Sequence, residues 1–323
     1  MPRTTTTRRA LLASALGLVL PGLGRAAAGE DGPARARPLA VKGVCLDLVS
    51  AGPRLIAVGE RGHVLLSDDS GAQWRQAAAV PTRATLTTLF ATDARTLWAA
   101  GHGGVILRSG DAGENWAAVY GKADARDVLL AIRVEADGRG LAVGGFGHAL
   151  RTSDGGASWR RATLLDGEAG EKHLNRIFVS SHATWLIAAE GGHVLRSEDR
   201  GEHWQAIKTP YAGSLWSGIQ LAGGALLVCG MRGNVARSTD DGRSWTHQAI
   251  ADAGSLTAIA TLADGRAVLV GVDGTLVTGS ASAEAFTLRR LDDRSALTGV
   301  VVLPSGALAL ASTAGVRVVS LLA

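Results

Sequence analysis

The chain has 323 residues, of which 46% are hydrophobic, 19% are charged and 43 are glycine, and this composition excludes a disordered or collagen-like chain. Its length fits either two ordinary domains or one large repetitive domain. The formal net charge of +4 would suggest a nucleic acid or an anionic membrane as partner if it were spread over the folded protein.

Residues 1–28 predict a secretory signal peptide that resembles a twin-arginine signal. They begin polar and basic, with the pair Arg8-Arg9, continue with an apolar run over residues 10–20, and end in small residues up to Ala28. The apolar run is shorter than the roughly twenty residues of a spanning helix; an uncleaved anchor is the alternative. We therefore expect export, cleavage near Ala28, a periplasmic location and no membrane span after cleavage.

The predicted signal peptide also carries the whole net charge. It contains four arginines and no acidic residue, which leaves 29 basic and 29 acidic residues in the remainder. A neutral mature chain gives no reason to expect nucleic-acid binding.

An internal repeat follows the predicted signal peptide. The pattern Ser/Thr-x-Asp-x-Gly-x-x-Trp occurs five times at a spacing of about 42 residues, and a glycine lies twelve residues before each tryptophan. Gly274 and Phe286 continue the register as a sixth, degenerate unit, and a seventh starts at Gly315, with Ser320 at the offset of the motif's hydroxyl residue. The copies are residues 67–74, 109–116, 152–159, 197–204 and 238–245.

Each unit has four short segments of strand character, separated by turn residues. In the second unit these segments are residues 86–90, 96–100, 105–109 and 115–120. Four strands at a period of 40–45 residues are typical of a β-propeller. We predict an all-β, seven-bladed β-propeller over residues 29–323. The last unit, residues 296–323, has only three such segments, so residues 34–42 are expected to complete the last blade and close the ring.

The repeated motif matches the Asp-box, or bacterial neuraminidase repeat. Its hydroxyl and carboxylate accept backbone N–H bonds within the turn between the third and fourth strands, and its tryptophan packs into the blade. A structural role follows for the five carboxylates, which are Asp69, Asp111, Asp154, Asp199 and Asp240. Asp-boxes also occur in sialidases, but neither Tyr120 nor Tyr211 lies near a glutamate and an arginine cluster in the sequence. A sialidase-like glycosidase is therefore the alternative rather than the prediction.

The fuller unit is Gly-x-x-Gly, an apolar strand, Arg-Ser/Thr and then the Asp-box, as in residues 101–116, 144–159 and 230–245. This arrangement resembles the photosystem II stability/assembly factor family over the whole mature chain. The resemblance implies an exported, non-catalytic, seven-bladed propeller, monomeric and without a cofactor, that holds a membrane protein during assembly, partly through exposed arginines. We therefore expect a scaffold or stability factor for a membrane or envelope protein complex.

Two groups of residues are candidates for binding. One arginine column stands just before the Asp-box hydroxyl in four consecutive blades, and its guanidinium groups suit carboxylates of a partner or, alternatively, of the neighbouring blade. A second candidate, for a glycan or small ligand, lies at the channel mouth, where Glu60-Arg61, Met231-Arg232, Phe146 and Tyr211 are also expected. The column is Arg108, Arg151, Arg196 and Arg237, and the channel group is Asn175, Arg176 and Trp216.

Neither the histidines nor the cysteines predict a metal site. His63, His148 and His193 recur at one turn position, but equivalent positions on a ring lie too far apart for one ion with bonds of about 2 Å. Cys45 and Cys229 lie in separate apolar stretches, so two buried thiols are expected rather than a disulfide.

Overall fold

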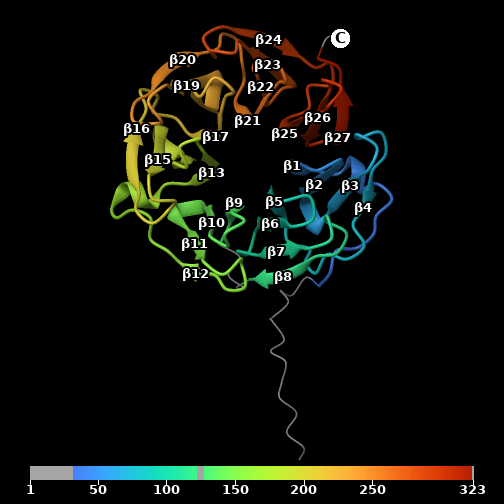
Figure 1. Cartoon of the computed structure of the whole chain (residues 1–323). Helices are drawn as coiled ribbons and strands as arrows, with labels where there is room; N and C mark the ends of the chain where they lie inside the picture. The colour runs from blue at the N-terminus through green and yellow to red at the C-terminus, as the bar shows by residue number, and fades with distance from the viewer. Residues whose placement is uncertain (1–31, 122–126, 322–323) are drawn as a thin grey trace, which may run out of the picture.

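The computed structural model describes residues 32–121 and 127–321, which form a closed ring of seven antiparallel β-sheets around a central channel (Figure 1). The predicted seven-bladed propeller is confirmed. Six blades have four strands in chain order and the seventh has three. The predicted signal peptide, residues 1–28, lies outside the described residues.

The strands take the same places in every blade. The first strands, nearest the channel, are β1 (Cys45–Ala51), β5 (Leu86–Ala91), β9 (Leu129–Val134), β13 (Leu174–Val179), β17 (Leu215–Gln220), β21 (Leu256–Thr261) and β25 (Leu297–Val302). The second strands are β2 (Arg54–Gly59), β6 (Leu97–Gly101), β10 (Gly140–Gly144), β14 (Trp185–Ala189), β18 (Leu226–Gly230), β22 (Ala267–Gly271) and β26 (Leu308–Ser312).

The third strands are β3 (Val64–Ser67), β7 (Ile106–Ser109), β11 (Ala149–Thr152), β15 (His193–Ser197), β19 (Asn234–Ser238), β23 (Thr275–Gly279) and β27 (Gly315–Val319). The outer fourth strands are β4 (Arg75–Gln76), β8 (Ala117–Tyr120), β12 (Arg160–Arg161), β16 (Gln205–Lys208), β20 (Thr246–Ala249) and β24 (Phe286–Arg290). The 3-10 turns are η1 (Ala40–Lys42), η2 (Glu60–Gly62), η3 (Gly145–Gly147), η4 (Glu168–Glu171), η5 (Glu190–Gly192) and η6 (Met231–Gly233).

The core lies between the blades. Second strands such as β14 and β18 are buried at every residue, because a neighbouring blade covers each of their two faces. Because consecutive strands are antiparallel, turns between second and third strands gather on one end of the ring, which we call the turn face. The turns between first and second strands and the Asp-boxes gather on the other end, the Asp-box face.

The predicted closure of the last blade by residues 34–42 is not what the structure shows. The sheet of blade seven contains only β25, β26 and β27 among the described residues. The N-terminal segment instead crosses the outside of blade one, where Ala34 N donates to Val80 O at 2.9 Å and Gln76 Nε2 donates to Arg35 O at 3.2 Å. Pro33 and Pro38 lack the N–H groups that a ladder strand needs.

The ring is closed at the channel instead. The hydroxyl of Thr298 in β25 donates to Cys45 O in β1 at 2.7 Å. The hydroxyl of Thr257 makes the same bond to Leu297 O one blade earlier, at 2.6 Å. The last and first blades are therefore joined by a contact that the other blades also use.

Blade seven also differs in its hairpin. Val319 pairs with Leu308, as Ser109 pairs with Leu97 in blade two. The turn between β26 and β27 is one residue shorter than in the other blades, so Val319 takes the place of the Asp-box hydroxyl residue. The prediction that Ser320 occupies this place is therefore wrong by one position.

Candidate functional site

The Asp-box carboxylates are bound within their own turns. In blade five, Ser238 Oγ donates to Asp240 Oδ1 at 2.8 Å, and the N–H of Ser244 donates to the same oxygen at 2.9 Å. The Trp245 indole N–H donates to Gly242 O at 3.2 Å. Burial acts to raise the pKa of Asp240, but the bonds from Ser244 and Ser238 outweigh it and hold the pKa at about 2. Matching hydrogen bonds hold Asp69, Asp111, Asp154 and Asp199.

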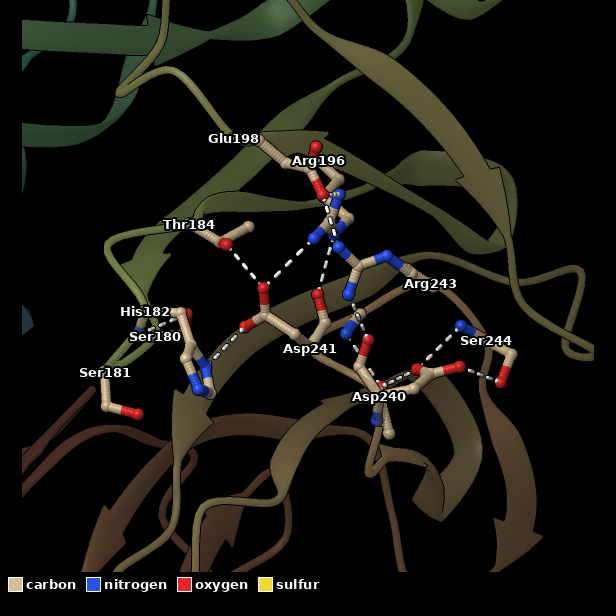
Figure 2. A network of polar contacts seen from close by, with 12 residues as sticks. Ser180, Ser181, His182, Thr184, Arg196, Glu198, Asp240, Asp241, Arg243 and Ser244 are labelled. Carbon is tan, nitrogen blue, oxygen red and sulfur yellow. Dashed lines mark hydrogen bonds and ion pairs between the residues drawn. The ribbon is translucent and has the colours of Figure 1, made fainter.

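Arg196, in the middle of the arginine column, joins blades four and five (Figure 2). Its side chain is only 4% exposed; Nε donates to Asp241 O at 2.7 Å and Nη2 lies 3.0 Å from Asp241 Oδ2. Nη1 lies 2.7 Å from Glu198 Oε1. The Asp241 carboxylate also accepts the hydroxyl of Thr184, which lies in blade four. This network joins the Asp-box turn of blade five to the preceding blade.

Two further arginines of the column make the same kind of contact. Arg151 Nη1 lies 2.8 Å from Glu202 Oε2 in the Asp-box turn of blade four. Arg237 Nη1 lies 3.7 Å from Glu284 Oε1 in blade six. Arg108 differs, since its exposed guanidinium lies over the ring of Trp98, 5.6 Å from the centroid. Of the four expected partner-binding arginines, only Arg108 has no carboxylate in contact among the described residues.

The channel contains an ion pair between opposite sides of the ring. Arg176 Nη1 in β13 lies 3.0 Å from Asp47 Oδ2 in β1. Asp47 is 5% exposed and also accepts the N–H groups of Leu48 and Leu89, each within 2.9 Å. The sequence analysis did not single out Asp47. A signal was present, because Asp47 is the only acidic residue at this position of the first strand, where the other six blades have Thr, Ala, Arg, Ser or Gly.

The ion pair lies beside a cavity of about 390 Å³ that occupies part of the channel and is lined by Arg176, Ser217 and Gln220 together with apolar side chains such as Phe178. Asn175 and Trp216 are not among the lining residues. The Asn175 amide instead donates to Leu215 O of the next blade at 2.8 Å. The structure therefore separates Arg176 from the two residues expected to act with it.

Exposed side chains gather on the turn face. The middle residue of the turn between second and third strands has a positive φ, which is 57° for Arg61, 52° for Phe146 and 56° for Arg232. Glycine occupies the equivalent position in blades two and four, as Gly103 and Gly191. The Phe146 side chain is 76% exposed, and the Arg61 side chain is 69% exposed. Asp273 holds the position in blade six with a φ of 57° and forms an ion pair with Arg294 at 3.0 Å. We call the other three non-glycine residues, Arg61, Phe146 and Arg232, the turn tips.

The two tyrosines considered for a sialidase-like site do not approach the channel cavity. The Tyr211 O–H donates to Met231 O at 3.1 Å, and its ring stacks on His247. Tyr120 ends β8 and packs in the cluster around Trp98. Over residues 32–121 and 127–321, no three His, Cys, Asp or Glu side chains come together as metal ligands, and no helix is long and apolar enough to span a bilayer.

Comparison with known proteins gives one matching family. Residues 121–279 match the family described as photosynthesis system II assembly factor YCF48. None of the curated proteins searched matches the chain.

Solved structures share the fold at low sequence identity. A structure of YCF48 bound to D1 peptide has 16% identity, covers 88% of this chain and 94% of its own, and gives a TM-score of 0.68. YCF48 from Cyanidioschyzon merolae also has 16% identity, with coverage of 89% and 98% and a TM-score of 0.66. A virginiamycin B lyase from Staphylococcus aureus has 12% identity, coverage of 88% and 96%, and a TM-score of 0.73. Assembly factors and lyases thus share this ring.

Proposed function

Since the chain belongs, through residues 121–279, to the photosystem II assembly factor YCF48 family, we propose that it holds a segment of a membrane or envelope protein during assembly of a complex. The proposed role is binding rather than catalysis. In the related structure, YCF48 is bound to a D1 peptide, so a polypeptide segment is the kind of ligand that we assign to this chain.

The turn tips carry this proposal. A non-glycine residue in the left-handed region costs about 1–2 kcal/mol, and glycine avoids that cost in blades two and four. Arg61, Phe146 and Arg232 nevertheless occupy the position with exposed side chains. Exposed, strained residues of this kind are typical of binding sites. A face with two arginines and a phenylalanine suits a segment that carries carboxylates and apolar side chains.

The ring also favours tight binding on this face. Each turn tip follows a second strand, β2, β10 or β18, in which every residue is buried except the half-buried Arg54 at the start of β2, so the position of its backbone is fixed before a partner arrives. Preorganised loops lose little conformational entropy on binding.

The test removes the turn tips without harming the fold. The triple variant Arg61→Gly, Phe146→Gly, Arg232→Gly relieves backbone strain while deleting all three side chains, so its melting temperature should not fall. Ser70→Gly, which changes a left-handed residue in an Asp-box on the opposite face, is the matched control. Both are expressed with an affinity tag in the native host, and co-purified subunits of membrane complexes are quantified by mass spectrometry.

We expect the triple variant to recover about tenfold less of the partner subunits than the wild type, and the Ser70→Gly variant to recover the wild-type amount. Recovery of the same subunits in equal amounts by the triple variant would exclude the turn face as the binding surface. A wild-type protein that brings down no membrane-complex subunit would refute the function itself.

We further propose that the protein is exported to the periplasm. Residues 1–28 support this by their order of basic, apolar and small residues. Mass determination of the protein from the periplasmic fraction should show an N-terminus near residue 29. A full-length protein in the cytoplasm would refute export, and changing Arg8-Arg9 to two lysines tests the twin-arginine route.

A further inference from the structure

We propose that blade seven binds an extended segment of a partner protein as its fourth strand, with an aromatic side chain of that segment filling the cavity beside β27. The inference extends the proposed function to a second surface, but it depends on the geometry of blade seven and not on the turn face.

The outer edge of β27 is open to another strand. Among the described residues β27 pairs only with β26, whereas the third strand of every other blade pairs on both sides. In blades one and three the outward carbonyls of Val64 and Ala149 accept N–H groups from Ala77 and Ala162 at 2.9 and 3.0 Å. By register Val316 occupies the same position in blade seven, so its carbonyl points outward. An open strand edge is a template for a further strand.

A cavity of about 360 Å³ lies next to this edge. It is lined by the turn between β21 and β22, which includes Leu262 and Asp264, by the turn between β25 and β26, which includes Ser305, and by Ser320 and Leu321. Its volume falls within the roughly 300–1,000 Å³ range of ligand pockets.

The other blades show what fills the corresponding place. Between blades four and five it holds the Asp-box turn of blade five, in which Asp241 bonds to Thr184 of the preceding blade. Trp245 follows and packs in one cluster with Leu186 and Leu226. In blade six Phe286 takes the tryptophan's place at the start of β24. An aromatic side chain that leads into a short strand is therefore the occupant that this fold uses.

Exposed apolar residues also mark the edge. Only three large hydrophobic side chains of the described residues are exposed: Leu39, Phe146 and Val318. Val318 lies in β27 at 39% exposure, and Leu39, at 67%, directly precedes η1, which contacts β27. An apolar strand edge of this kind is a site for association with another chain.

The chain's own N-terminal segment does not fit the site. Residues 1–44 contain no Phe, Tyr or Trp, and residues 34–37 are bound along blade one. A second copy does not offer a free extended segment with an aromatic side chain: tryptophans such as Trp204 and Trp245 are each 7% exposed in their own blades, and the exposed Phe146 lies in the tight turn η3. A partner with a free extended segment is therefore the occupant we assign.

The probe is a labelled peptide with the sequence of residues 238–249 of this chain, which carries an Asp-box, Trp245 and a fourth strand. Its binding to the intact protein is followed by fluorescence anisotropy, and the matched control peptide carries Trp245→Ala. We expect saturable binding of the first peptide and about tenfold weaker binding of the control.

Two protein variants locate the site. Val318→Pro removes one backbone donor from an edge strand, where proline is tolerated, while Val318→Thr keeps the donor and the β-branched shape. Ser305→Trp fills the cavity, with Ser305→Ala as its control. Val318→Pro and Ser305→Trp should each weaken peptide binding about tenfold, and the two controls should leave it unchanged.

The inference fails if the peptide does not bind, or if it binds these two variants as well as the wild type. If the wild-type protein sediments as a dimer and the Val318→Pro variant sediments as a monomer, the occupant is a second copy of this chain and the inference is overturned. The proposed function is tested separately with the triple turn-tip variant. If that variant loses capture of membrane proteins but still binds the peptide, the turn face and the edge of blade seven are two separate binding surfaces.

Discussion

The arginine column yields a direct test, because its members have different surroundings. Arg196→Met removes a nearly buried cation and leaves the Asp241 carboxylate, itself 13% exposed, without its charged partner. Two charge-assisted hydrogen bonds to Asp241 are lost at the same time. Bonds to charged groups contribute about 1.5–3 kcal/mol each, and breaking a buried ion pair costs about 3–5 kcal/mol. We expect a loss of about 3 kcal/mol, because Thr184 still donates to Asp241.

Arg108→Met is the matched control from the same column. Arg108 is exposed and contacts the ring of Trp98 without a carboxylate partner among the described residues, so its cation–π contact accounts for about 0.5–1 kcal/mol. Equilibrium unfolding in urea, followed by tryptophan fluorescence, measures both variants. With a slope of about 3 kcal/mol per molar, the midpoint of Arg196→Met should fall by about 1 M and that of Arg108→Met by about 0.3 M or less.

A double-mutant cycle isolates the pair. Asp241→Asn keeps a side chain that tolerates the positive φ of 60° at this position. The combined change with Arg196→Met should cost about 2 kcal/mol less than the sum of the single changes. Equal midpoints for Arg196→Met and Arg108→Met, or additive single effects in the cycle, would refute the role of Arg196 in joining blades four and five.

Three further predictions concern titratable and channel residues. Burial raises the pKa of Cys45 to about 12 and also raises that of Cys229, so neither thiol should react with a disulfide reagent at pH 8 until urea unfolds the protein. Hydrogen bonds from the side chain and backbone of Ser158 lower the pKa of Asp154 to about 2. The ionised Asp154 carboxylate therefore stabilises the fold above about pH 4, and this stabilisation is lost as the pH falls through 2. Asp154→Asn should reduce this pH dependence of the urea midpoint. Asp47→Ala should destabilise the ring more than changing Arg176 to Met, because the Asp47 carboxylate keeps three donors when the arginine is lost, and urea unfolding of both variants checks the order.

Much of the fold follows from local patterns in the sequence. In blade two the predicted strand over residues 86–90 is β5 (Leu86–Ala91), and the one over residues 96–100 is β6 (Leu97–Gly101). The agreement is close because the turn residues between strands recur at fixed offsets from each Asp-box, and turn chemistry is a local property. The two buried free thiols, Cys45 and Cys229, were likewise predicted and are confirmed.

Pairings between distant segments could not be predicted in this way. The path of residues 34–37 depends on hydrogen bonds with the side chain of Gln76, far along the chain. The alternation of apolar and polar residues in the sequence gives no information on such bonds. The pair of Asp47 and Arg176 joins residues that are 129 positions apart. The aligned arginines were visible in the sequence, but whether each meets a carboxylate of the next blade depends on the residues of one turn, such as Asp241.

The distribution of ion pairs distinguishes the two faces of the ring as binding surfaces. On the Asp-box face Arg151, Arg196 and Arg237 each already have a carboxylate in place, and only Arg108 has none among the described residues. A partner's carboxylate must therefore displace an acceptor at three of the four arginines, such as Glu202 at 2.8 Å from Arg151, and the displaced carboxylate then remains close to the newcomer. On the turn face Arg61 lies 3.8 Å from Glu60, and Arg232 forms no ion pair with a described residue. Binding on the turn face therefore adds charge pairs without breaking any of those that join the blades, and raising the salt concentration should weaken partner binding more than it lowers the stability of the ring.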